Sequence, residues 1–357
     1  MIVNRFPMPV GGGGHIYGVS WDGTSTTAWT RTDAAAGFTD PVPYVAGATS
    51  YGSPFDNLMP WSGMEIVEDS KAGTLVSIPK FWYKLTQRNS VITIQIADSA
   101  VGGFSVAPTH MDRGDGKGER DVVYIGRYHC GEKAYKSASG QKPKGSVARA
   151  VFRTNIHNLG STIWQADWAM RFTLFLLYLV EFANWNSQDK IGYGCSPSGS
   201  IVNMGYTDSM PYHTGTDRAS RTTYGGTQYR YIEGLWDNVY DWIDGCVNTS
   251  SGLKLILNPS SFSDSNTGTA VGTPSNGYPS AFSVKEVSGT FPLFIPSAAS
   301  GSDSTYSCDY WDFSASNPCV CAGGGRYQST GRGLFYWGCH AASYSSAYFS
   351  SRSMKLP

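Results

Sequence analysis

Residues 161–186, STIWQADWAMRFTLFLLYLVEFANWN, form the most apolar stretch of the chain. Apolar side chains fall on nearly every face of a helix drawn through them, a pattern typical of a helix buried on most sides. Ser161 is a suitable N-cap, and Asn184 to Ser187 supply the stop. The run from Phe172 to Val180 is closed by Glu181 and is far shorter than the roughly 20 residues that a membrane helix needs. The sequence therefore predicts a core helix and no membrane insertion.

Short strands are expected on both sides of this helix. Residues 74–96 predict a β-hairpin: LVSIPKFWYKL, then a polar turn at 86–90, then the alternating VITIQIA. Pro79 places the first of these strands at an edge or a bulge. A strand, VVYIGRYHC, follows Asp121, and the alternation in residues 229–244 favours a strand over a helix. The chain after residue 253 consists of further strands and turns.

These elements predict an α+β protein with three parts. Residues 1–15, which end in a glycine run, are expected to form an N-terminal anchor or linker. Residues 16–120 predict a small β-rich domain, and a glycine-rich, charged loop at 110–121 marks its boundary. Residues 121–357 predict a second domain that contains the core helix.

Composition excludes several classes of function. Lys and Arg total 27, as do Asp and Glu, so the net charge is zero and no field steers the chain to nucleic acid. The N-terminus lacks the pattern of a signal peptide, which predicts folding in a cytoplasm and reduced thiols for the seven cysteines. A metal site built from Cys319, Cys321, Cys339 and His340 has poor zinc-ligand spacing, so no metal is expected.

No motif for catalysis or cofactor binding is present. The chain has no G-x-S-x-G, no P-loop, no G-x-G-x-x-G after a strand and no H-E-x-x-H. His129 and His213 have no partner at a fixed spacing, and Asp237, Asp241 and Asp244 are interpreted as structural hydrogen-bonding groups. We expect no catalytic residue and no cofactor.

The C-terminal segment, residues 303–352, has an unusual composition. It contains no lysine, glutamate or methionine but many aromatic residues set among serine, glycine and arginine. Antibody loops have a similar composition, because aromatic side chains give large contacts at small entropic cost. Alternation in GLFYWGC, residues 333–339, is expected to send about half of these side chains into the core. The segment therefore predicts a binding surface with a packed aromatic base.

Several motifs in order resemble a known family. They are YIGRY, the helical W-x-x-x-W, GLWDNVYDW, a late G-G-x-Y, G-L-F and Arg352. From residue 121 onward the chain resembles the C-type-lectin-like domains of formylglycine-generating enzymes and of variable proteins from diversity-generating retroelements. SPFDNLMPWSGM, IPKFWYK and DRGDGKGERD also resemble segments of tail proteins from gut bacterial phages.

This resemblance implies a variable region at residues 303–352. In the family, adenine-directed mutagenesis of Asn codons excludes Lys, Glu, Gln, Met and Trp. Gln328, Trp311 and Trp337 depart from that rule and would be fixed positions or come from other templates. Gly324, Gly333, Leu334, Phe335 and Arg352 would be scaffold, and Gly338 a further variable site. The implied ligand-binding residues are Cys308, Trp311, Phe313, Arg326, Gln328, Arg332, Tyr336, Trp337, His340, Tyr344, Ser346 and Tyr348.

The function implied is that of a receptor-binding protein at a phage or prophage tail tip, made in the bacterial cytoplasm and carried on the virion. Its expected partners are a host cell-surface protein or glycan and phage tail or baseplate proteins, with a homotrimer as the expected assembly. Calcium-mediated sugar binding is unsupported, because the lectin W-N-D order is changed at residues 236–238. Two alternatives stay open: a thiol oxidase that uses Cys319, Cys321 and Cys339, and a structural virion component without a ligand.

Overall fold

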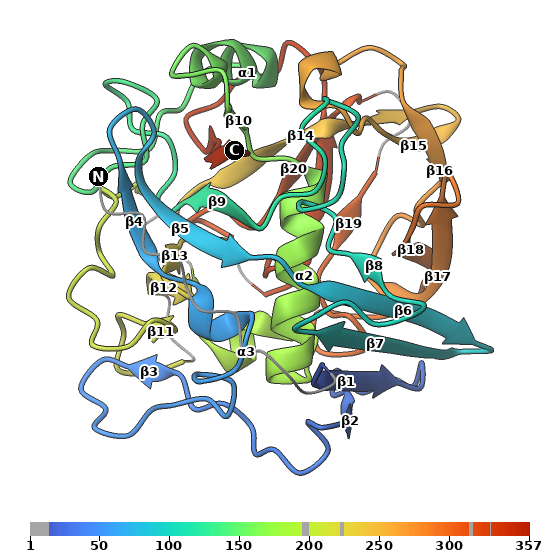
Figure 1. Ribbon diagram of the computed structural model, residues 1–357. Helices are drawn as coiled ribbons and strands as arrows, with labels where there is room; N and C mark the ends of the chain where they lie inside the picture. The colour runs from blue at the N-terminus through green and yellow to red at the C-terminus, as the bar shows by residue number, and fades with distance from the viewer. Residues whose placement is uncertain (1–13, 195–199, 222–224, 314–316, 329) are drawn as a thin grey trace.

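The computed structural model describes residues 14–194, 200–221, 225–313, 317–328 and 330–357. Nearly all of the expected anchor or linker, residues 1–13, lies outside the described residues. Helix α2 (Trp168–Phe182) crosses the middle of the molecule, and strands from both ends of the chain surround it (Figure 1).

The core helix is confirmed, but it begins later than expected. All 15 residues of α2 are buried, and its N-cap is Asp167, whose carboxylate accepts from Met170 N at 2.9 Å. Ala183, with φ of 48°, ends the helix in the left-handed conformation. The expected N-cap, Ser161, is wrong because residues Ile163–Gln165 form strand β10, which pairs with the C-terminal strand β23 (Ser353–Lys355).

Two sheets contain all the described strands of the N-terminal part except β3 (Tyr44–Val45). One has the order β2 (Thr30–Asp33), β1 (Ile16–Trp21), β7 (Val91–Ala97), β6 (Trp82–Arg88), β8 (Ser105–Val106). The other has the order β10, β23, β9 (Val122–Gly126), β5 (Gly73–Pro79), β4 (Ile66–Asp69). The hairpin of β6 and β7 is confirmed. However, β5 belongs to the second sheet, and Pro79 ends this internal strand rather than marking an edge.

The C-terminal part contains the largest sheet. Its order is β16 (Thr269–Gly272), β15 (Gly252–Leu255), β14 (Tyr240–Thr249), β20 (Cys319–Ala322), β21 (Trp337–His340), β19 (Trp311–Asp312), and β22 (Phe349–Ser350) also pairs with β14. The single strand predicted in residues 229–244 is divided: β12 (Thr227–Tyr229) ends at Tyr229, β13 covers Ile232–Glu233, and β14 begins at Tyr240. The reason is that positive φ angles, among them those of Gly234 and Asn238, turn the chain between these strands.

The remaining elements complete the fold. A small sheet has the order β13 (Ile232–Glu233), β12 (Thr227–Tyr229), β11 (Gly215–Thr216), β3 (Tyr44–Val45), and β17 (Pro279–Val287) pairs with β18 (Phe291–Ala299). Short helices are α1 (Arg149–His157), α3 (Ser187–Lys190), η1 (Trp61–Gly63) and η2 (Pro259–Ser261). Among the described residues, no helix has the length and apolar character that crossing a membrane requires.

The expected α+β class, a C-type-lectin-like domain preceded by a small β-rich domain, is wrong. The protein is β-rich, with 35% of its residues in strands and 10% in helices. The physical reason is that, among the described residues, α2 is the only long apolar helix. Elsewhere, short apolar runs alternate with turn residues, which favours strands.

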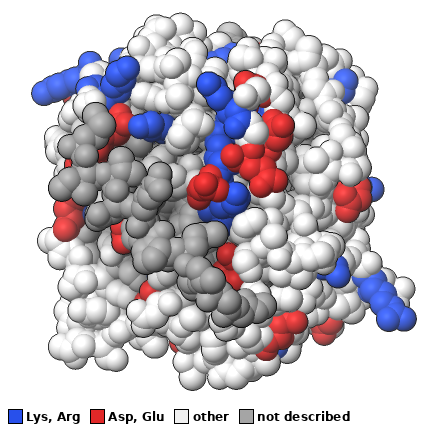
Figure 2. Space-filling view, in the orientation of Figure 1, with Lys and Arg blue, Asp and Glu red and all other residues white. Residues whose placement is uncertain are grey.

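The larger of two hydrophobic clusters spans the chain from Tyr17 to Leu356, and a smaller cluster contains Tyr240, Tyr336 and Phe349. Strands β5 and β9, from either side of residue 120, pair in one sheet. The division into parts at residues 16–120 and 121–357 stays a prediction about folding units. On the face shown in Figure 2, most of the surface is uncharged, and basic and acidic side chains lie in mixed groups. That distribution agrees with a net charge of zero.

Candidate ligand-binding surface

Five of the predicted ligand-binding residues are buried in the largest sheet or beside it. Trp311 stacks on Phe313 and on Trp337, with ring centroids 5.5 and 5.6 Å apart. Trp337 also meets Phe175 of α2 at 6.1 Å. These rings therefore form the layer that attaches the sheet to the core helix. The buried members of the predicted set are Cys308, Trp311, Phe313, Tyr336 and Trp337.

Other side chains, all but one of them from the C-terminal segment, reach solvent and form what we call the tyrosine surface. All of its members are partly or fully exposed, and Tyr327 and Tyr344 retain 50% and 37% of their accessible area. Four of them, Arg332, His340, Tyr344 and Tyr348, belong to the predicted set. The tyrosine surface consists of Tyr278, Tyr310, Tyr327, Arg332, His340, Tyr344 and Tyr348.

Ring contacts join one half of the tyrosine surface. Tyr310 meets Tyr278 edge-on, with centroids 5.0 Å apart. The Arg332 guanidinium lies over the ring of Tyr310 at 5.3 Å and over buried Tyr336 at 4.4 Å. Cation–π contacts of this kind hold an arginine in place, and Arg332 Nη1 also donates to Gly331 O at 3.3 Å.

The other half rests on Phe349 of β22. His340 stacks on Tyr344 at 4.3 Å, and both contact Phe349 at 4.8 and 5.2 Å. Tyr327 packs edge-on against Tyr348 at 4.5 Å. Tyr348 O accepts from Tyr240 N of β14 at 2.8 Å, which ties this half to the sheet.

The loop that carries Tyr344 is held at its far end. Ser346, another predicted ligand-binding residue, is partly exposed. Its carbonyl accepts from Ser146 N at 2.9 Å, and its hydroxyl accepts from Tyr348 N at 3.3 Å. The loop therefore presents its tyrosines from a fixed backbone.

Buried polar groups fix the turn that presents Arg332. The Asp309 carboxylate accepts from Gly333 N at 2.7 Å and Phe335 N at 2.9 Å. Ser187 Oγ accepts from Leu334 N at 2.9 Å, and Arg171 of α2 donates to Leu334 O at 2.5 Å. A side chain at position 333 would collide with Ser187 and Asp309, which explains the glycine. Leu334 and Phe335 are buried, as expected of scaffold positions.

Arg352, also expected to be scaffold, is 1% exposed. Its guanidinium donates to Asp241 Oδ2 at 3.0 Å, Gly234 O at 2.7 Å and Arg127 O at 3.1 Å. Burial alone would raise the pKa of Asp241, but Arg352 and His129 hold it well below its usual range. The pair fixes β14 beside the C-terminal strands β20 and β22, with which it pairs.

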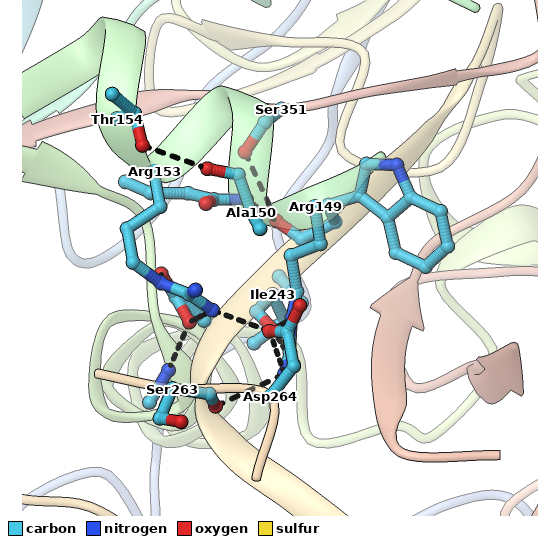
Figure 3. A network of polar contacts seen from close by, with 12 residues as sticks. Arg149, Ala150, Arg153, Thr154, Ile243, Ser263, Asp264 and Ser351 are labelled. Carbon is cyan, nitrogen blue, oxygen red and sulfur yellow. Dashed lines mark hydrogen bonds and ion pairs between the residues drawn. The ribbon is translucent and has the colours of Figure 1, made fainter. Parts of the chain in front are cut away.

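Helix α1 is attached to the same strand by two arginines (Figure 3). Arg149 donates to the carbonyls of Ile243 and Cys246, at 2.9 and 2.8 Å. Arg149 and Arg153 also share one oxygen of Asp264, at 2.8 and 2.5 Å. The network therefore supports the face of the sheet that bears the C-terminal segment.

The last two predicted residues, Arg326 and Gln328, flank Tyr327 in the sequence. Gln328 is partly exposed, and its backbone N–H donates to Gly325 O at 2.9 Å. Arg326 instead lines a cavity beside the tyrosine surface, together with Tyr206 and Asp237. The structure thus brings Arg332, His340, Tyr344 and Tyr348 together over one set of buried rings, in which Tyr240 contacts Tyr336 at 5.6 Å and Phe349 at 4.8 Å. Arg326 is next to Tyr327 of the tyrosine surface in the sequence.

The sequence-based set missed Tyr278, Tyr310 and Tyr327. Tyr278 precedes the C-terminal segment by more than twenty residues. It joins the patch only through its contact with Tyr310. No local pattern distinguishes it. Tyr310 stands in an aromatic run, TYSCDYWDF, where its exposure beside buried Trp311 follows from the alternation of a strand.

The described thiols lack the character of reactive groups. Cys130, Cys246, Cys308, Cys319, Cys321 and Cys339 are buried and free. Burial raises the pKa of Cys319 to about 12, so its thiolate is scarce at neutral pH, and thiolate is the nucleophilic form. Within the described ranges, no group of three or more His, Cys, Asp or Glu side chains is arranged to hold a metal ion.

Asp237, in the turn before β14, makes stability depend on pH. It is 1% exposed and accepts from Thr227 N at 2.6 Å and from the Tyr206 hydroxyl. Burial raises its pKa to about 8, although these donors act in the opposite direction. Because the pKa is raised on folding, the stabilising protonated form is fully present below the unfolded value of 3.8 and is lost as pH rises through about 8.

We therefore expect wild type to lose more stability than Asp237→Asn between pH 5 and pH 8. Urea denaturation at several pH values measures this effect. At each pH, the urea midpoint of wild type is compared with that of Asp237→Asn. Parallel pH profiles for both proteins would contradict the assignment, since other titrating groups are common to both.

A scan against models of known protein families found no match to this chain, and a search of curated proteins found none either. The fold and the site define a β-rich protein that holds an exposed tyrosine patch on a buried aromatic base.

Proposed function

We propose that this chain is a receptor-binding protein of a phage or prophage tail, and that the tyrosine surface contacts a protein or glycan on a host cell. The observation that carries the proposal is the division of residues 303–352. One part is buried and attaches the sheet to α2, and the other part is exposed over the smaller hydrophobic cluster, which contains Tyr240, Tyr336 and Phe349.

The side-chain chemistry of the tyrosine surface supports recognition. Tyrosine and arginine are enriched among residues that carry most of the binding energy at interfaces. Tyrosine offers a large, rigid contact area at low entropic cost, and its hydroxyl serves both protein and glycan partners. Ring stacking and the bonds of Asp309 already order the patch, so little conformational entropy is lost on binding.

We further propose that the exposed positions vary between sibling proteins through a diversity-generating retroelement. Two features support this: the segment lacks lysine, glutamate and methionine, and its backbone is held by buried groups. Exposed side chains can then change without loss of the fold. Assembly as a trimer on tail or baseplate proteins would raise the avidity of individually weak contacts.

The binding function is tested by Tyr344→Ala in the full chain. Binding of labelled protein to bacterial cells, measured by flow cytometry, is expected to weaken at least tenfold, about 1.4 kcal/mol. The matched control is Tyr51→Ala, because Tyr51 is 38% exposed and Tyr344 37%, and Tyr51 packs instead on Tyr44 of β3.

Equal binding by the two variants would contradict the role of the tyrosine surface. If wild type bound no strain in a broad bacterial panel, the alternative of a structural virion component would replace the proposal.

A further inference from the structure

A cavity of about 190 Å³ lies beside the tyrosine surface. Its described walls come from loops: Asp217 and Arg218 follow β11 of the small sheet, and Gly226 precedes β12. Arg326 connects the two features, because it lines the cavity while its neighbour Tyr327 belongs to the tyrosine surface. The lining residues that carry the argument below are Tyr206, Asp217, Arg218, Asp237, Asn238 and Arg326.

The cavity is held open by fixed groups. The Asn238 side chain bonds both backbone groups of Val202, at 3.0 Å each, and Arg326 N donates to Asn238 O at 3.1 Å. Gly226 lies so close to the Tyr206 ring that a Cβ would come within 2.1 Å of it. These contacts position the walls before any ligand enters.

Two polar atoms in the lining have unused hydrogen-bonding capacity among the described residues. Arg326 Nε is buried and has no hydrogen-bond partner there, and the same is true of Asp217 Oδ1. The Arg218 Nε atom lies 3.8 Å from that oxygen, too far for a hydrogen bond. Buried polar groups in native proteins usually have hydrogen-bond partners, so such atoms indicate a position where a ligand or water supplies the missing hydrogen bond.

The charges of the lining favour an anion. Arg218 and Arg326 supply two guanidinium groups, which bind carboxylates through paired N–H donors. Burial raises the pKa of Asp217, and it raises that of Asp237 to about 8, so at neutral pH the latter is mainly uncharged. The cationic groups therefore outweigh the carboxylates.

The volume of the cavity and its remaining polar and aromatic groups restrict the class of ligand. The volume far exceeds the roughly 10–15 Å³ that one water needs, yet is below the roughly 300 Å³ at which drug-sized sites begin. Asp217 can accept hydrogen bonds from ligand hydroxyl groups, and Tyr206 offers a ring against which a sugar can lie.

We propose that this cavity is a subsite for an acidic sugar, with Arg326 and Arg218 binding its carboxylate and Asp217 accepting from its hydroxyls. The inference rests on the proposed function, since it makes the cavity the place where a terminal acidic residue of a host glycan enters while the tyrosine surface contacts the rest.

The test measures binding of glucuronate to the full chain by calorimetry, with glucose and acetate as comparison probes. Glucuronate is expected to bind at least tenfold more tightly than either probe. Arg326→Gln and Arg218→Gln are each expected to weaken glucuronate binding at least tenfold. The matched control Arg88→Gln, at an exposed arginine on β6, is expected to leave it unchanged.

Three outcomes would overturn the inference: no binding of glucuronate, equal binding of acetate, or equal binding of glucuronate by the Arg326→Gln and Arg88→Gln variants. Circular dichroism of each variant establishes that it is folded. The two proposals fail separately. If wild type binds cells but not glucuronate, only the subsite proposal is wrong. If wild type binds glucuronate but no cells, the proposed receptor-binding function is wrong.

Discussion

Replacing Arg352 with leucine is expected to lower the free energy of unfolding by about 3–5 kcal/mol, the usual cost of removing one partner of a buried ion pair. Arg352 and Asp241 are 1% and 3% exposed. The substitution leaves the Asp241 carboxylate without its closest cation, and it leaves Gly234 O and Arg127 O without their donor. Urea denaturation measures the loss.

Two further variants make this result specific. Arg88→Leu removes an exposed arginine and is expected to change stability by less than about 0.5 kcal/mol. Arg352→Leu combined with Asp241→Leu removes both charges, so part of the lost stability should return. If the double variant had a lower free energy of unfolding than Arg352→Leu, the unpaired charge of Asp241 would not be the cause of the lost stability.

Replacing Arg149 with leucine is expected to cost about 2–4 kcal/mol, because two buried carbonyls lose their donor at roughly 1–3 kcal/mol each. The side chain is fully buried, and its bonds to Ile243 O and Cys246 O attach α1 to β14. Asp264 keeps its bond to Arg153, so the acidic partner is not left alone. Thermal unfolding followed by circular dichroism measures the effect.

The comparison variant for this prediction is Lys133→Leu, at an exposed position before α1. A loss of stability for Arg149→Leu no larger than that for Lys133→Leu would contradict the anchoring role. Because β14 pairs with β20 and β22 of the C-terminal segment, the Arg149→Leu protein should also bind cells more weakly near its unfolding temperature.

The core helix could be predicted because its apolar residues leave no polar face. Its first residue could not, since Ser161 and Asp167 are both good N-caps and only the pairing of β10 with β23 decides between them. That pairing joins residues about 190 positions apart, which no local pattern reports.

The candidate site could be predicted only in part, because tertiary contacts also decide which of its side chains are buried. Alternation predicts that about half of the side chains in residues 333–339 turn inward, but the strand β21 begins only at Trp337. Before it, a turn held by Asp309 buries Leu334, Phe335 and Tyr336 in succession. The contribution of Tyr278 depends on tertiary packing and has no signature in the sequence around it.

The central claim is that residues 303–352 combine a fixed buried base with an exposed surface that is free to change. Sequencing the coding segment in sibling isolates tests it most directly. We predict that substitutions concentrate at exposed positions, including Arg332, His340 and Tyr344, and spare the buried Trp311 and Trp337. Substitutions spread evenly along the whole chain, or equally frequent at buried and exposed positions of the segment, would contradict the claim.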